Sequence, residues 1–154
     1  VESCTIVGNH SRNYIAGGGG VHYEGGSGSD GNVFNSIVYF NTGYAPANWF
    51  TSGTAKKLFW THACTIPTNG LFVSGCITNN PSFAHAGALT GAPNVSYYVL
   101  QPRSPCLDLG LWQNWMTQAY DLLGNPRVDG QSGLPDIGCL ERVPPPRGTT
   151  LVVR

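Results

Sequence analysis

Short runs of apolar and β-branched residues, each closed by a polar turn residue, recur along the first half of the chain. The stretch from Ser3 to Asn9 (SCTIVGN) can be laid over Asn35 to Asn41 (NSIVYFN), and each copy reads as a short strand that ends in Asn. Glycine-rich corners and the apolar stretch Val21 to Tyr23 lie between the two copies. Such a repeat is typical of a β-solenoid, in which each turn buries its apolar side by stacking on the next.

Asn suits the end of such a strand because it tolerates a left-handed backbone and its amide can bond to the same residue one repeat away. We therefore expect Asn9 and Asn41 to form a structural ladder. Strand character returns in three later stretches, which are residues 58–65, 71–78 and 95–100. Only residues 111–119 (LWQNWMTQA) favour a helical turn. The pattern therefore predicts an all-β fold with little helix.

Two segments depart from the repeat. Residues 42–57 (TGYAPANWFTSGTAKK) are rich in Pro, Gly and polar residues, and they predict an inserted loop that projects from the solenoid. Residues 143–154 form a proline-rich tail with an apolar end, which we expect to pack back on the solenoid or to pair with another chain. A chain of 154 residues fits one domain, which we place at residues 1–142.

Composition removes several classes of partner. Charged residues make up 10% of the chain, and eight basic residues balance eight acidic ones, so no basic surface for nucleic acid or anionic membrane is expected. No apolar run approaches the roughly 20 residues that span a bilayer. The first residues lack the features of a signal peptide, so we expect a mature fragment or a chain that starts inside a longer protein.

The five cysteines leave at least one unpaired within the chain, and none has a CxxC or Cys/His metal spacing. Two interpretations stay open for them. Several can point into a core as small hydrophobic side chains, or Cys64 and Cys76 can form a disulfide bond. We predict no metal and no cofactor. A metal site at His22, Glu24 and Asp30 is the alternative to a solvated turn there.

Several phrases resemble the C-terminal region of bacterial parallel β-helix proteins of the polymorphic outer membrane protein type, including those with a choice-of-anchor Q domain. They occur in the family's order and span about two-thirds of the chain: NSIVYFN (35–41), FWTHACTIP (59–67), GCITNNPSF (75–83), YVLQPRSPCLDLG (98–110) and DLLGNPRVDGQSGLPDIGCLE (121–141). The last two are the specific ones. Cys139 and Leu123 depart from the family's pattern, which usually has Ala and Asp there.

The resemblance implies a right-handed parallel β-helix and an extracellular or cell-surface setting, and it implies no reaction. The residues that recur in the family look structural. We expect four of them to pair or to cap corners near the end of the solenoid, namely Asp108, Asp121, Arg127 and Asp136.

Parallel β-helices include polysaccharide lyases and glycoside hydrolases, so catalysis has to be considered. Glycoside hydrolysis needs two carboxyl groups about 5 to 9.5 Å apart, which acids on adjacent turns of a solenoid would satisfy. Before Asp108 the only acids are Glu2, Glu24 and Asp30, and they form no such pattern. A fragment or subunit of a polysaccharide lyase or glycoside hydrolase is therefore the alternative, and we predict no catalytic residues.

Aromatic residues outside the repeat suggest a sugar-binding surface, because aromatic faces stack on sugar rings. The candidates are Tyr44, Trp49, Phe50, Trp112 and Trp115, whereas Trp60 is expected in the core. The sequence therefore predicts a non-catalytic structural or adhesive module of an exported bacterial protein, with polysaccharide as its candidate ligand. An open solenoid edge or the tail predicts a homo-oligomer.

Overall fold

The computed structural model describes residues 1–12, 17–26, 28, 30–43, 47–53, 57–85, 94–128 and 130–144. Within these ranges the regular structure consists of eight short strands and two 3-10 helices. All five strand pairs are parallel. The predicted all-β class with little helix is confirmed.

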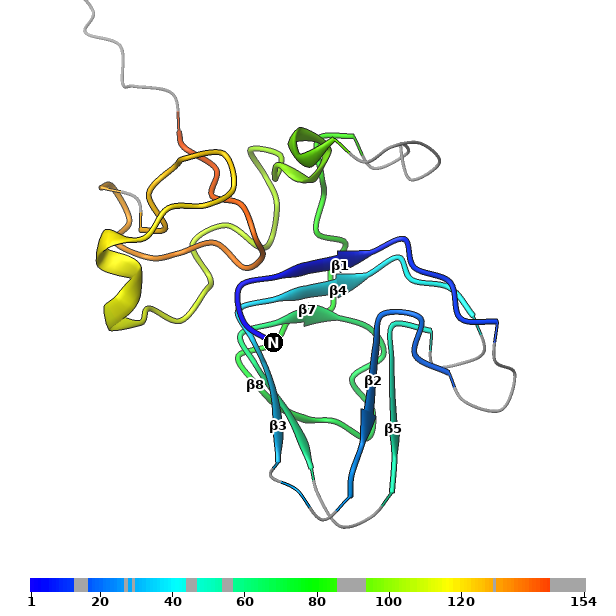
Figure 1. The fold of residues 1–154 in the computed structure, drawn as a ribbon. Coiled ribbons are helices and arrows are strands. Elements are labelled where there is room, and N and C mark those ends of the chain that lie inside the picture. The colour runs from blue at the N-terminus through cyan, green and yellow to red at the C-terminus, as the bar shows by residue number, and fades with distance from the viewer. Residues whose placement is uncertain are drawn as a thin grey trace, which may run out of the picture.

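The strands form three parallel sheets that the chain enters in turn. The first sheet holds β1 (Thr5–Val7), β4 (Ile37–Tyr39) and β7 (Cys64–Thr65). The second holds β2 (Val21–Glu24) and β5 (Trp49–Ser52). The third holds β3 (Gly31–Phe34), β6 (Leu58–Thr61) and β8 (Phe72–Ser74). Figure 1 shows the three sheets around a common interior.

The register of the first sheet follows the repeat in the sequence. Thr5 lies beside Ile37 and Val7 beside Tyr39, which is the offset at which the two copies align. At the end of these strands the backbone N–H and side-chain amide of Asn9 both donate to Asn41 Oδ1 at 3.0 Å. The expected Asn9–Asn41 contact is therefore present, and it joins neighbouring strands where the chain turns.

The first sheet is buried on both faces. Alternate side chains of a strand point to opposite faces, so Val38 enters the interior shared by the three sheets while Ile37 and Tyr39 face away from it. The interior cluster consists of Val33, Val38, Trp49, Leu58, Trp60 and Ala63. The outer cluster consists of Ile37, Tyr39, Cys64, Phe83, Leu100, Cys106 and Ile137. The C-terminal part of the chain, described for residues 83–85, 94–128 and 130–144, lies over this outer face (Figure 1).

That C-terminal part is mostly irregular, with 3-10 helices η1 (Val95–Tyr98) and η2 (Asn114–Gln118). η2 lies within residues 111–119, where the sequence predicts a helical turn. The strand predicted at residues 95–100 is wrong for its first four residues, which form η1. The Asn94 side chain accepts hydrogen bonds from the Ser96 N–H and hydroxyl, and this cap favours a helical start over an extended one.

The projecting loop predicted at residues 42–57 is also wrong in part, because β5 lies inside it and pairs with β2. Trp49 opens this strand and points into the interior, where 6% of it is exposed. Its indole N–H donates to the Pro67 carbonyl at 2.7 Å. The residues on both sides of β5 are typical of turns, so the local sequence does not indicate a strand. Pairing with β2 and the bond to Pro67 stabilise it. The predicted tail lies outside the described residues from residue 145 on.

Candidate functional site

A pocket of about 300 Å³ opens where the start of β1 meets the C-terminal part of the chain. Its wall is formed by Ser3, Cys4, Trp115, Tyr120, Asp121, Leu122, Arg127 and Cys139. Trp115 is 48% exposed and Tyr120 is 68% exposed. The pocket therefore offers aromatic surface to solvent at a concave site.

The position of Trp115 follows from the way η2 is anchored. Met116 is buried and holds the helix to the core, and in a 3-10 helix the adjacent residue projects in a different direction. Trp115 thus projects from the core, and its indole N–H donates to Glu2 Oε1 at 3.1 Å. This bond ties the aromatic side chain to the first residues of the chain.

The predicted sugar-binding aromatics are not brought together. Trp112 and Trp115 are both exposed, but only Trp115 lines the pocket. Phe50 lies on β5, away from the pocket, and its ring makes an edge-type contact with the His22 ring at a centroid distance of 5.3 Å. Tyr44 lies outside the described residues. Trp49 was predicted to face a ligand, and this is wrong because its side chain fills the interior. Tyr120 was not predicted, because a lone Tyr beside a turn gives no periodic signal.

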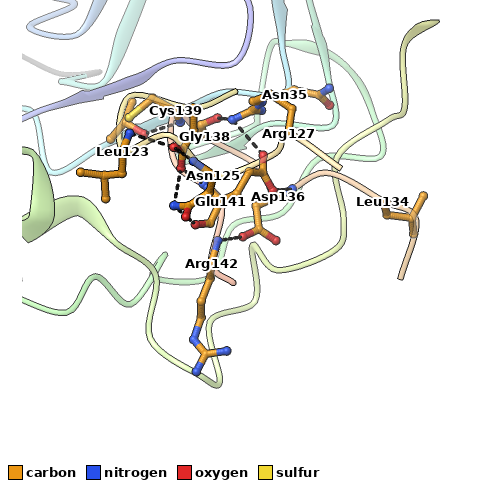
Figure 2. Close-up of polar contacts among 12 residues, drawn as sticks. Asn35, Leu123, Asn125, Arg127, Leu134, Asp136, Gly138, Cys139, Glu141 and Arg142 are labelled. Carbon is orange, nitrogen blue, oxygen red and sulfur yellow. Dashed lines mark hydrogen bonds and ion pairs between the residues drawn. The ribbon is translucent and has the colours of Figure 1, made fainter. Parts of the chain in front are cut away.

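A cluster of charged groups adjoins the pocket through Asp121 and Arg127, and Figure 2 shows its polar contacts. Asp121 organises one turn: its Oδ1 accepts from the backbone N–H groups of Leu123 and Asn125, both at 2.8 Å. Its Oδ2 accepts from the Glu141 N–H at 2.8 Å. These bonds explain why a carboxylate is needed here, since one side chain satisfies three backbone donors.

Asp136 performs a similar task for a different part of the chain. Its Oδ1 accepts from the Asp108 N–H and its Oδ2 from the Arg142 N–H, both at 2.8 Å. Asp108 joins this cluster through its backbone N–H, and the residue itself is exposed.

Arg127 provides the positive charge of the cluster. Its Nη1 lies 2.9 Å from Glu141 Oε1 and donates to the Gly138 carbonyl at 3.1 Å. Glu141 Oε2 accepts from the Asp136 N–H at 2.8 Å, which links the two acids. Sequence reasoning did not single out Glu141, although it closes the phrase that holds Asp136.

The cluster places three carboxyl groups beside one guanidinium. Burial raises the pKa of Glu141 to about 8, although Arg127 acts against that shift. Burial likewise raises the pKa of Asp136 to about 6. Burial also acts to raise the pKa of Asp121, but its hydrogen bonds from Glu141, Asn125 and Leu123 outweigh it and hold that pKa below the ordinary value. Glu141 therefore retains its proton near neutral pH, because one cation does not balance the two buried acids Asp136 and Glu141.

This arrangement supports structure more directly than acid–base chemistry. Among the acids that the structure describes, only Asp121 lines the pocket, and backbone donors occupy both of its oxygens. No group of three or more His, Cys, Asp or Glu residues suited to a metal ion occurs in the described part of the chain. Nor do the described residues form a helix with the length and apolar character needed to cross a bilayer.

Comparison of the chain with protein-family models, with curated proteins and with solved structures found no match.

Proposed function

We propose that the chain is a short right-handed parallel β-helix from an exported bacterial protein, and that it serves as a non-catalytic adhesive or structural module that binds polysaccharide. The order in which the chain enters its three parallel sheets supports the β-helix. The extracellular or cell-surface setting rests on the resemblance of the phrases near residues 98–110 and 121–141.

The observation that carries the binding proposal is the pocket with two exposed aromatic side chains, Trp115 and Tyr120. The apolar face of a sugar ring stacks on an aromatic face and leaves its hydroxyl groups free to bond at the edges. η2 and the turn of Asp121 hold the pocket wall, so little order has to be gained when a ligand binds.

The state of the acids favours binding over catalysis. A glycoside hydrolase needs one carboxyl to give a proton and a second to attack or to activate water in the same cleft. Here Asp136 and Glu141 are almost fully buried and bonded to backbone N–H groups. A substrate in the pocket would meet aromatic faces and a single occupied carboxylate.

The experiment is calorimetric titration of the chain with a panel of neutral and acidic polysaccharides, with Trp115→Ala and Tyr120→Ala beside the wild type. Loss of one stacking face should weaken binding about tenfold. Trp112→Ala is the matched control, because Trp112 is 44% exposed but does not line this pocket. Equal binding by all four proteins would overturn the pocket as the site.

The same polysaccharides are incubated with the protein and assayed for new reducing ends. We expect none. Release of reducing ends that is lost in Glu141→Gln would instead support the alternative, a fragment of a polysaccharide-degrading enzyme.

The predicted homo-oligomer remains part of the proposal. β8 is an edge strand of the third sheet and exposes Phe72 and Val73, so a second copy would add there. Light scattering of wild type and Val73→Lys tests it.

A further inference from the structure

Two cysteines meet in the outer core, between the first sheet and the C-terminal part. Cys64 begins β7, Cys106 lies in the irregular segment after η1, and both are fully buried in the same apolar cluster. The Cys106 side chain neighbours the Cys64 thiol, and that thiol donates to the Asn79 carbonyl at 3.2 Å. The two residues belong to different parts of the fold, so the contact is long-range.

Backbone hydrogen bonds hold both residues in place. The Cys64 N–H donates to the Ser36 carbonyl at 2.9 Å, which fixes β7 beside β4 in the first sheet. The Cys106 N–H donates to Ser104 Oγ at 3.1 Å, and its carbonyl accepts from the Ile137 N–H at 2.9 Å. The fold itself therefore holds both residues in the same buried cluster.

Cys76 does not share this arrangement. It is half-buried in the turn after β8, and its thiol points to the Ser74 carbonyl at 3.7 Å. The structure records all five cysteines as thiols, and the Cys76 thiol bonds to a carbonyl of its own turn, so the alternative of a Cys64–Cys76 bond gains no support.

We propose that Cys64 and Cys106 form a disulfide bond when the chain folds in an oxidising environment, and that this bond links β7 to the C-terminal part. Each thiol gives up its proton, and the pair loses two electrons as the S–S bond forms. A small disulfide of the oxidised-glutathione class takes up the two electrons and two protons and leaves as two thiols. In the cell the step rests on the proposed export, whereas the test below does not.

The bond has to form during folding. The hydrogen bond with Cys106 and burial both raise the pKa of Cys64, and a protonated thiol is a poor nucleophile. Once the outer core has closed, neither sulfur is open to an oxidant. The chain must therefore be refolded in the presence of the oxidant, rather than exposed to it after folding.

Peptide mapping tests the proposal directly. The full chain is refolded with oxidised and reduced glutathione, its remaining thiols are alkylated, and trypsin is added without reductant. Cleavage after Lys57, Arg103 and Arg127 gives peptides 58–103 and 104–127, which hold Cys64 and Cys106. We expect these two peptides to be recovered linked.

Peptide 58–103 also contains Cys76, so the mapping is repeated on Cys76→Ser. The link should persist in that variant. Recovery of an alkylated Cys106, a link from 104–127 to 1–12 or to 128–142, or loss of the link in Cys76→Ser would each overturn the proposal.

A second measurement needs no digestion. A disulfide that closes a long stretch of chain restricts the unfolded state, so reduction should lower the melting temperature of the refolded protein by about 10 °C. The same drop is expected in Cys76→Ser and no drop in Cys106→Ala. An equal drop in Cys106→Ala would assign the effect to another cysteine pair.

Discussion

The side-chain amide of Asn35 forms a closed pair of hydrogen bonds with the backbone of Leu111, donating to its carbonyl at 2.8 Å and accepting from its N–H at 2.7 Å. Asn35 is fully buried and has a φ of 47°, so it also makes the corner between β3 and β4. One residue thus turns the chain and ties the C-terminal part to the sheets.

Asn35→Ala should lower the free energy of unfolding by about 2 to 4 kcal/mol, because two backbone groups lose their partner and Ala is strained at positive φ. Urea denaturation measures it. Asn35→Gly removes the strain but not the loss of bonds, so it should still be destabilised. Wild-type stability in Asn35→Gly would show that the pair with Leu111 contributes nothing.

The two asparagines of the ladder should differ in weight. Asn41 is buried, and its side-chain amide donates to the carbonyls of Ile6 and Tyr39 while its Oδ1 accepts from Asn9. Asn41→Ala should cost about 2 to 3 kcal/mol in urea denaturation, since several buried groups are left unpaired. Asn9 is exposed, so water replaces its bonds and Asn9→Ala should cost less than about 1 kcal/mol. A larger loss of stability in Asn9→Ala than in Asn41→Ala would contradict this account of the ladder.

Gly20 is required for space rather than for its backbone angle. A Cβ there would lie 2.4 Å from the Asn48 carbonyl oxygen and 2.6 Å from Asn41 Nδ2. Gly20→Ala should therefore destabilise the protein by about 1 to 3 kcal/mol, measured as a lower midpoint of thermal or urea unfolding. Gly26→Ala is the control, because nothing lies within 4 Å of its Cβ, and it should be neutral. Equal stability of the two variants would show that the strands at Gly20 can move apart.

The buried acid cluster predicts a stability that falls as pH rises from about 5 to about 8. In the folded chain the pKa is about 6 for Asp136 and about 8 for Glu141, against 3.8 and 4.5 as their ordinary values. Between those limits the folded state binds more protons than the unfolded state, so raising the pH favours unfolding. Asp121 acts in the opposite sense, and its contribution is lost as pH falls through its lowered pKa.

Urea denaturation near pH 5 and near pH 8 tests this expectation. Glu141→Gln should reduce the difference between the two conditions, whereas Asp30→Asn, at an exposed position, should leave it unchanged. A protein that becomes more stable toward about pH 8 would refute the retained proton.

How much of this could be predicted from sequence depends on the range of the forces involved. The Ser3–Asn9 and Asn35–Asn41 copies carry their own strand and corner signals, so β1, β4 and the Asn9–Asn41 contact were within reach. β5 was missed because only its pairing with β2 distinguishes it from the turn-rich residues beside it.

The site was harder to predict for a related reason. The sequence marks Trp115 as an aromatic outside the repeat, but it gives no sign that Trp49 is buried, because the Pro67 carbonyl that accepts its indole N–H is remote in sequence. In the irregular region around Arg127 and Glu141 no periodicity tells which side chains turn inward. Such contacts depend on tertiary packing, which the local sequence does not report.

The placement of residues 135–141 against the first sheet has a consequence for synthesis. The Cys139 N–H donates to Thr5 Oγ1, and Ile137 packs on Ile37 in the outer core, so nearly the whole chain separates the partners. As the polypeptide leaves the ribosome, the outer apolar face of β4 stays partly uncovered until this late segment arrives. Contacts so distant in sequence make folding slow and leave that face open to association with other nascent chains. The first strands to be made are thus among the last to be protected.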